Sequence, residues 1–277
     1  MSEGLSIIIV SYNDYRALYG CIESILRYND IGPRMEIVII DNSTTNVVLN
    51  IDQYRQYINI FYYHMNHNVG FGRANNFGVT LSHFDNLCFL NQDTKIVEPV
   101  FAYAVRLLSA GNVDMLGFKL VNDLGRPVQS FGTMPQSWNL LNLFILTDTV
   151  RTFLGIHAPH FYIQGADIFI RKQVFNAIGG FDESIFLFGE EIDLTTRFDK
   201  ENYKKKFIRS KTIIHSSGEG RTVKQRQERT RQLSRSLDYL YGKYKFRNYR
   251  RWIFANRVKY FLTRNIEYKI LSKGPNI

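Results

Sequence analysis

Short apolar runs alternate with longer stretches of helical periodicity over the first 120 residues. Three of the runs, at residues 5–10, 36–40 and 87–90, are short and almost wholly apolar, which is typical of buried β-strands. Strands that alternate with helices in this way form βαβ units around a largely parallel sheet. The pattern therefore predicts an α/β fold.

Polar residues follow each of these strands directly. The three polar clusters are Ser11-Tyr12-Asn13, Asp41-Asn42-Ser43 and Asn91-Gln92-Asp93. In open α/β sheets, ligands bind outside the carboxyl ends of the strands. We therefore expect the three clusters to line one crevice.

The pattern is less regular between residues 121 and 163, where glycine and proline interrupt it. An apolar stretch at residues 138–154 could form an amphipathic helix that shapes the site of a second substrate, or a helix that only packs. Regular structure is expected to resume with a strand at 162–171, helices at 172–178 and 190–202, and a strand at 206–215.

Charge divides the chain into two parts. The net charge is +10, but residues 221–277 hold 16 Lys and Arg against 3 Asp and Glu, whereas residues 1–220 hold 19 against 22. The tail, which is also rich in aromatic residues, suits a polyanionic partner such as an anionic membrane surface or a nucleic acid. The acidic first part shows no such preference.

Cysteine usage and hydropathy indicate the compartment. The two cysteines, Cys21 and Cys88, lie beside apolar positions of expected core elements, where a free thiol behaves as a small hydrophobe. No disulfide framework is indicated, which favours a reducing compartment. The first apolar run stops after Val10, and no stretch approaches the roughly 18 apolar residues of a spanning helix. We expect a cytoplasmic protein that is soluble, or peripheral on the inner face of the cell membrane.

Three residues at strand ends could bind a ligand. The Asp93 carboxylate could hold a hard divalent cation together with phosphate oxygens, although Asn and Asp are also common in strand-terminal turns. Asp41 could accept a hydrogen bond from a nucleobase imide or a ribose hydroxyl, or it could form a local turn. His215 could be a metal ligand or a phosphate contact. Taken alone, each of these residues is more often structural.

A glycine-rich segment spans residues 68–76. Its glycines, Gly70 and Gly72, permit close approach of another backbone, and Arg73 could meet a phosphate group. A bare Gly-x-Gly occurs in many structural contexts.

An acidic cluster at Glu190, Glu191 and Asp193 is the best candidate for proton transfer. Carboxylates are also favoured at the start of any helix, because they complement the helix dipole. The preceding turn carries an apolar strip that would bring the acids toward a cleft, which favours the functional interpretation.

Six segments, read in order, resemble glycosyltransferase family 2, the inverting family with the GT-A fold, and in particular its bacterial rhamnosyltransferase-like branch. They are IIIVSYN, VIIDNS, NVGFGRANNFG, CFLNQDT, GADIFIRKQVFNAIGGFDESIFLFGEEIDLTTRF and IIHSSG. The resemblance covers about residues 5–218. It implies a GT-A type nucleotide-diphospho-sugar transferase fold, a Rossmann-like mixed sheet flanked by helices, as a catalytic domain at 1–220. Residues 221–277 would be a basic, aromatic-rich helical extension.

The resemblance also assigns roles at the crevice. Asp41 would contact the base of the donor nucleotide, and Ser11, Tyr12 and Asn13 would wall its pocket. The cluster Asn91-Gln92-Asp93 occupies the D-x-D position, with Asn91 in place of the first acid and Asp93 as the retained metal-binding acid. The implied cofactor is Mg²⁺ or Mn²⁺, and His215 matches a position that completes the metal site in some members.

Two further sets of residues take roles from the resemblance. Gly70, Arg73 and Asn76 would contact the donor, although the chain has Ala74-Asn75-Asn76 where the family has A-R-N, so whether Arg73 supplies the arginine is open. Glu191 matches the general base, with Glu190 as the alternative. Asp193 would orient the helix or its neighbours.

The resulting prediction is a metal-dependent glycosyltransferase of cell-surface polysaccharide or lipopolysaccharide synthesis. It would move a sugar with inversion from dTDP-rhamnose or a UDP-hexose to a glycan or lipid-linked acceptor. We expect the tail to bind an anionic membrane surface, the other possibility being that it packs on the catalytic domain.

Two alternatives stay open. A sugar nucleotidyltransferase would carry a glycine-rich signature with Arg and Lys directly after the first strand, where this chain has SYNDYRALYG. A nucleic-acid-binding protein would use the basic tail, and the acidic first part argues against it. No nucleic-acid partner is expected.

Overall fold

The computed structural model describes residues 3–44, 49–134, 160–216 and 223–246. The helix expected at 138–154 and the part of the tail after residue 246 lie outside the described residues. None of the described helices is both long enough and apolar enough to cross a membrane.

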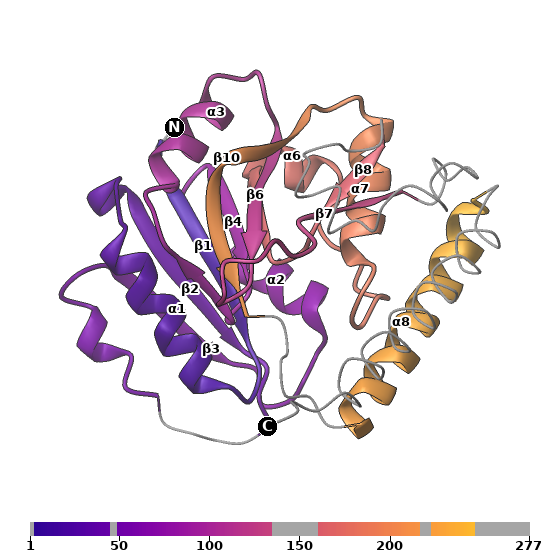
Figure 1. The fold of residues 1–277 in the computed structure, drawn as a ribbon, viewed down its shortest axis with the longest axis horizontal. Coiled ribbons are helices and arrows are strands. Elements are labelled where there is room, and N and C mark those ends of the chain that lie inside the picture. The colour runs from indigo at the N-terminus through magenta and orange to yellow at the C-terminus, as the bar shows by residue number, and fades with distance from the viewer. Residues whose placement is uncertain (1–2, 45–48, 135–159, 217–222, 247–277) are drawn as a thin grey trace, which may run out of the picture.

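An eight-stranded mixed sheet forms the centre of the molecule (Figure 1). In spatial order its strands are β3 (Asn59–His64), β2 (Met35–Asp41), β1 (Leu5–Ser11), β4 (Asn86–Leu90), β9 (Asp167–Arg171), β6 (Met115–Val121), β10 (Lys205–His215) and β5 (Thr94–Ile96). Strands β3, β2, β1 and β4 run parallel to one another, as do β6 and β10. Strand β9 is antiparallel to both β4 and β6, and β5 is antiparallel to β10. The predicted fold class is confirmed.

Helices cover both faces of this sheet and close two hydrophobic cores. On one face, α1 (Tyr15–Arg27) and α3 (Phe101–Ser109) pack in a cluster that includes Leu5, Ile7 and Ile9 of β1. On the other, α2 (Phe71–Thr80), α6 (Lys172–Ala177) and α7 (Glu190–Lys200) pack in a cluster that includes Ile8. Strands buried on both faces read as continuous apolar runs, which explains why the sequence identified them. Short 3₁₀ helices lie at Gly32–Arg34 and Asp52–Tyr54.

The strand expected at residues 162–171 is wrong as a single element. Its first part is β8 (Phe161–Ile163), which pairs with β7 (Phe131–Thr133) in a separate two-stranded sheet, and its second part is β9 in the main sheet. Between them the backbone N–H of Gln164 donates to Ser130 O. The chain therefore changes sheets at Gln164 and Gly165.

Helix α8 (Val223–Tyr244), near the start of the tail, packs on the rest of the chain. Leu237, Leu240 and Phe246 share a buried cluster with Ile185 and Ile192 of the segment around the start of α7. The tail up to residue 246 therefore contributes to a third hydrophobic core, as the packing interpretation predicts. Cys21 and Cys88 are both free and buried.

Candidate active site

The polar clusters after β1 and β4 meet at the carboxyl ends of these parallel strands. The backbone N–H of Tyr12 donates to Gln92 Oε1 at 3.0 Å, and Gln92 Nε2 donates back to Tyr12 O at 3.2 Å. This paired contact fixes the two loops against each other. The side chain of Tyr12 remains exposed beside it, and Asn13 has a positive φ of 53°.

The cluster after β2 joins the same network. The backbone N–H of Asn13 donates to Ser43 Oγ at 2.8 Å, and that of Asn42 donates to Ser11 O at 2.8 Å. Ser43 in turn donates from its N–H and its Oγ to Asp41 Oδ1, at 3.0 and 2.5 Å. The three clusters therefore meet at one edge of the sheet, and the crevice that they are expected to line stays a prediction.

The Asp41 carboxylate is fully buried, and both of its oxygens accept hydrogen bonds. Oδ1 is held by Ser43 and Oδ2 accepts from Tyr62 Oη at 2.7 Å. Asp41 therefore forms the local turn and organises the loop after β2, and a contact with a nucleobase stays a prediction. Ser11 Oγ is also buried, and it has no hydrogen-bond partner among the described residues.

The two expected metal ligands, Asp93 and His215, lie side by side. Asp93 Oδ1 is 3.4 Å from His215 Nε2, and the backbone N–H of Ser216 donates to Asp93 O at 2.9 Å. Antiparallel pairing of β5 with β10 brings them together, since Thr94 is the register partner of His215. The side chain of Asp93 is 28% exposed and that of His215 is 11% exposed, so the carboxylate is the more accessible.

This pair fits a divalent cation. A carboxylate oxygen and an imidazole nitrogen that each lie about 2.0–2.2 Å from one cation are about 3 Å apart, close to the observed separation. Among the described residues, no third His, Cys, Asp or Glu joins them in a metal-binding group. Asn91, at the first position of the D-x-D-like cluster, is half-buried, and its backbone oxygen accepts from Thr94.

The glycine-rich segment packs against the loop before α7. Gly70 has a φ of 92°, and an added Cβ would lie 2.8 Å from Phe186 O. The N–H of Phe71 donates to the same oxygen at 3.0 Å. A Cβ on Gly72 would lie 3.1 Å from that of Phe181. The close approach that these glycines permit is therefore, in this structure, an approach to another part of the chain.

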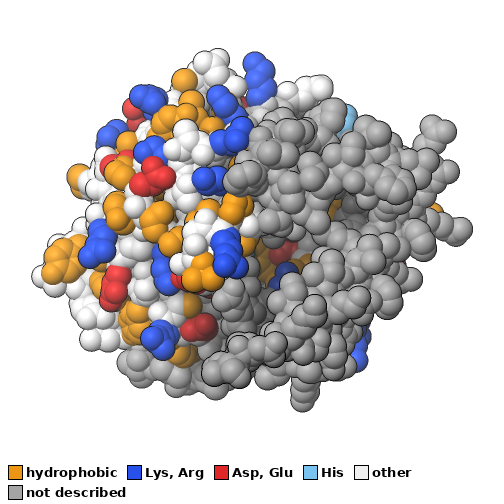
Figure 2. Space-filling model, viewed as in Figure 1, with side chains coloured by type: hydrophobic (Ala, Val, Ile, Leu, Met, Phe, Trp, Pro, Cys, Tyr) orange, Lys and Arg blue, Asp and Glu red, His pale blue; other side chains and the backbone are white. Residues whose placement is uncertain are grey.

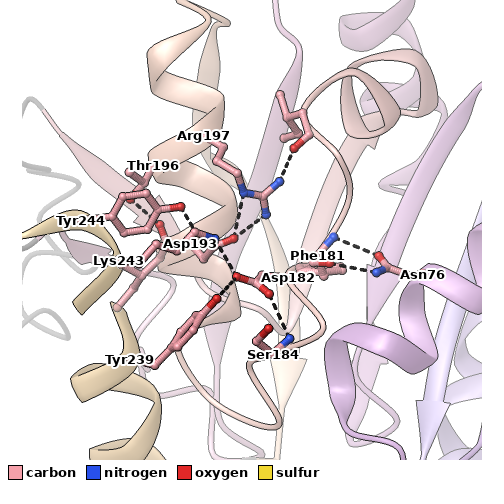
Figure 3. Close-up of polar contacts among 12 residues, drawn as sticks. Asn76, Phe181, Asp182, Ser184, Asp193, Thr196, Arg197, Tyr239, Lys243 and Tyr244 are labelled. Carbon is pink, nitrogen blue, oxygen red and sulfur yellow. Dashed lines mark hydrogen bonds and ion pairs between the residues drawn. The ribbon is translucent and has the colours of Figure 1, made fainter. Parts of the chain in front are cut away.

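Arg73 and Asn76 contact the same loop. Arg73 Nε donates to Glu183 Oε2 at 2.9 Å. The Asn76 amide donates to Phe181 O and accepts from Phe181 N, both at 2.9 Å (Figure 3). The structure thus joins the glycine-rich motif to the acidic-turn motif, and contact of Gly70, Arg73 or Asn76 with a donor stays a prediction.

The acidic pair lies at the start of α7, directly after Gly189. Glu190 is buried, and its Oε2 has no hydrogen-bond partner among the described residues. Glu191 is half-buried and accepts from the N–H of Gly189 at 3.2 Å. Burial, together with the charge of Glu191, raises the pKa of Glu190 well above its ordinary value. Burial also raises the pKa of Glu191, although backbone hydrogen bonds and Arg229 oppose the shift. A carboxyl with a raised pKa suits a general base that works near neutral pH.

Sequence reasoning missed the residues that hold this turn in place. Asp182 and Asp193 stand within the recognised motif, but the motif gives no partner for them. Their partners are Tyr239, Lys243 and Tyr244 of α8 (Figure 3). No spacing signal marks Lys243 among the 16 Lys and Arg residues of the tail.

Two of the relatives of this chain are named as glycosyltransferases. The chain is 27% identical over 213 residues to the low-salt glycan biosynthesis hexosyltransferase Agl10 of Haloferax volcanii, which covers 73% of this chain and 64% of that protein. It is 30% identical over 57 residues to the N-acetylglucosaminyl-diphospho-decaprenol L-rhamnosyltransferase of Mycobacterium tuberculosis, which covers 21% of this chain and 19% of that one. The chain thus spans about two thirds or less of each relative.

The fold has a solved counterpart. The mannosyltransferase PcManGT from Pyrobaculum calidifontis, in complex with GDP-Man and Mn²⁺, superposes with a TM-score of 0.59 at 12% identity, over 85% of this chain and 63% of that one. The sequence pattern of glycosyl transferase family 2 matches residues 6–169, more than half of the chain. The match includes the three polar clusters and the glycine-rich segment, and we conclude that the chain belongs to glycosyl transferase family 2.

Proposed function

We propose that this protein transfers a sugar from a nucleotide-diphosphate donor to a hydroxyl of a glycan or lipid-linked acceptor, with inversion, in cell-surface polysaccharide synthesis. The observation that carries the proposal is the approach of Asp93 to His215 within 3.4 Å. Asp93 of this pair directly follows Gln92, whose side chain joins the loops at the ends of β1 and β4. PcManGT, which has the same fold, was solved with a nucleotide sugar and Mn²⁺.

The chain's own residues divide the reaction into two tasks. Asp93 and His215 would hold Mg²⁺ or Mn²⁺, which stabilises the growing negative charge of the departing diphosphate when bound. Glu191 removes the proton of the acceptor hydroxyl. The acceptor oxygen then forms a bond to the anomeric carbon as the bond from that carbon to the diphosphate oxygen breaks. Attack from the side opposite the leaving group inverts the configuration.

The donor is proposed to be dTDP-rhamnose or a UDP-hexose. The two curated relatives support this class of donor, since one is named as a hexosyltransferase and the other as an L-rhamnosyltransferase. Tyr12 and Asn13 are exposed beside the end of β1 and would contact the nucleoside. The buried Ser11 Oγ, which has no partner among the described residues, would hydrogen-bond to the same ligand.

The test uses the full chain with Mn²⁺ and a panel of nucleotide sugars. One donor is expected to raise the melting temperature, since a ligand at about 100 times its Kd stabilises a folded protein by about 2.7 kcal/mol. The same donor should then release nucleoside diphosphate when an acceptor is added. Pyrophosphate formed from a nucleoside triphosphate and a sugar phosphate would instead support a nucleotidyltransferase. Salt-sensitive binding to DNA or RNA, without binding of any donor, would support the nucleic-acid alternative.

The contact with an anionic membrane surface is proposed for the tail after α8. Residues 247–277 hold eight Lys and Arg against one Glu. On the face shown in Figure 2, by contrast, Lys and Arg side chains of the described residues lie among acidic and hydrophobic ones. The rhamnosyltransferase relative is named for a lipid-linked acceptor, and an acceptor of that kind would explain attachment to the cytoplasmic side of a membrane.

Truncation after Phe246 tests this contact and keeps the buried residues of α8. Each basic residue near an anionic surface contributes about 1 kcal/mol, so loss of even two engaged residues lowers liposome affinity by about thirtyfold. The loss should be seen in co-sedimentation with anionic vesicles at low salt and shrink at moderate salt, with neutral vesicles as the control. Unchanged binding by the truncated chain would contradict the membrane role of these residues.

A further inference from the structure

Helix α8 contacts the loop that leads into the acidic pair. Ser236 Oγ donates to Leu187 O at 2.9 Å. A Cβ added to Gly189 would lie only 3.1 Å from Leu240 Cδ1, so the loop and the helix are in close contact at that glycine. Gly189 immediately precedes the two glutamates. The backbone that presents Glu190 and Glu191 is therefore packed directly on α8.

Lys243 of α8 joins the two ends of the same loop. Its Nζ lies 2.6 Å from Asp182 Oδ2 and 2.7 Å from Asp193 Oδ1 (Figure 3). Asp182 precedes the loop and Asp193 lies in the first turn of α7, so the glutamate pair stands between the two aspartates in the chain. Lys243 thus links the residues on the two sides of the segment that carries the candidate base.

Two tyrosines of α8 donate hydrogen bonds to the same two aspartates, and we call these contacts, together with those of Lys243, the bridge. Tyr239 Oη donates to Asp182 Oδ2 at 2.8 Å, and Tyr244 Oη donates to Asp193 Oδ1 at 2.6 Å. Asp193 is fully buried, and its other oxygen is paired with Arg197. A buried carboxylate that loses a partner is strongly unfavourable, so Asp193 ties α8 to α7 tightly.

Contacts within the bridge shift the pKa values of Asp182 and Lys243. Burial raises the pKa of Asp182, but hydrogen bonds from Lys243, Ser184 and Tyr239 outweigh it and bring the pKa to about 2. Burial lowers the pKa of Lys243, but the hydrogen bonds to Asp182 and Asp193 outweigh it and raise the pKa above its ordinary value. Asp182 and Lys243 are therefore both ionised at neutral pH.

We propose that α8 is a positioning element for the catalytic base and that Lys243 is its principal positioning residue. The proposal rests on the function proposed above, in which the glutamate pair accepts the proton of the acceptor. A base acts only within about 2.6–3.2 Å of the proton that it removes, and a misplacement of about 1 Å can cost about a hundredfold in rate. The positioning comes from a helix that follows the segment matched by the family, residues 6–169.

The test compares Lys243→Met with Lys243→Arg in the full chain. Lys243→Met is expected to lower kcat for sugar transfer by about tenfold to a hundredfold while the Kd for the donor stays within about twofold, because the donor crevice is built from other elements. Water should reach the loosened glutamates, so the acidic limb of the pH profile should move to lower pH. Lys243→Arg keeps the cation and should restore part of kcat.

Arg231→Met is the matched control, since it removes one positive charge from the same helix, where Arg231 pairs with Glu228 at an exposed position. It should leave kcat, donor Kd and the pH profile as in the wild type. Tyr244→Phe removes a single hydroxyl and keeps the test available if Lys243→Met does not fold; it should give a smaller loss of kcat, again without a change in donor Kd.

Sugar transfer by the wild type tests the proposed function. The difference in kcat between the variants tests the positioning role of α8. A folded Lys243→Met protein with the kcat and pH profile of Arg231→Met would overturn the positioning role while leaving the proposed function intact. Equal losses of kcat in Lys243→Met and Arg231→Met would overturn the positioning role as well.

Discussion

Glu191→Gln is expected to bind the donor as the wild type does and to turn it over about a hundredfold more slowly, or worse. The amide has nearly the shape of the carboxylate but cannot take a proton from the acceptor. Glu191 is the better placed of the two glutamates, because its side chain is half-buried whereas that of Glu190 is buried. The measurement is kcat for transfer beside donor Kd from titration.

Two other substitutions serve as a control and as a test of the assignment within the pair. Glu201→Gln changes an exposed acid just after the other end of α7 and should leave kcat unchanged. Glu190→Gln changes the buried neighbour and should be milder than Glu191→Gln. If Glu190→Gln is the damaging change and Glu191→Gln is mild, the assignment within the pair is wrong.

The pH dependence of the wild type follows from the same pair. Burial raises the pKa of Glu191, and an acid with a raised pKa stays protonated to a higher pH than an ordinary Glu, whose pKa is about 4.3. Only the deprotonated form can act as the base. Turnover should therefore rise with pH, with a midpoint above that of an ordinary glutamate, and the rising limb should be absent in Glu191→Gln.

The strand ends of the crevice were predictable because their signal is local. Strands buried on both faces require continuous apolar runs, and the residue at which the run stops marks the carboxyl end of the strand. Ser11, Asp41 and Asn91 could be placed in this way. The same logic failed at residues 162–171, because an apolar run does not reveal that its two halves pair with different sheets. Gln164 and Gly165 at the break were the available signal.

The contacts that complete the site depend on distant parts of the chain. Asp93 and His215 are 3.4 Å apart only because β5 pairs with β10. Apolar periodicity predicted a strand ending at His215 but not its neighbour. The bridge of Lys243 to Asp182 and Asp193 is likewise tertiary, since it needs α8 to fold back on the start of α7.

Asp93→Ala is expected to lower metal-dependent donor turnover by about a hundredfold or more, in line with the several kcal/mol that a bound cation contributes to charge stabilisation. The fold should persist. The side chain is 28% exposed, and the hydrogen bond from Ser216 is to the backbone oxygen, which alanine retains. Turnover is measured against Mn²⁺ concentration, with melting temperature as the check on folding.

The controls separate loss of the cation from loss of an acid. Asp52→Ala removes an exposed carboxylate paired with Arg55 and should behave as the wild type. His215→Ala should weaken the response to Mn²⁺ and leave some turnover at high metal concentration, because the more accessible, anionic ligand remains. Since the cation is proposed to act on the leaving diphosphate, a chelator should lower wild-type turnover to the level of Asp93→Ala and have little further effect on that variant. Full activity in chelator, or in Asp93→Ala, would mean that other groups of the chain stabilise the diphosphate and that Asp93 and His215 form only a structural contact between β5 and β10.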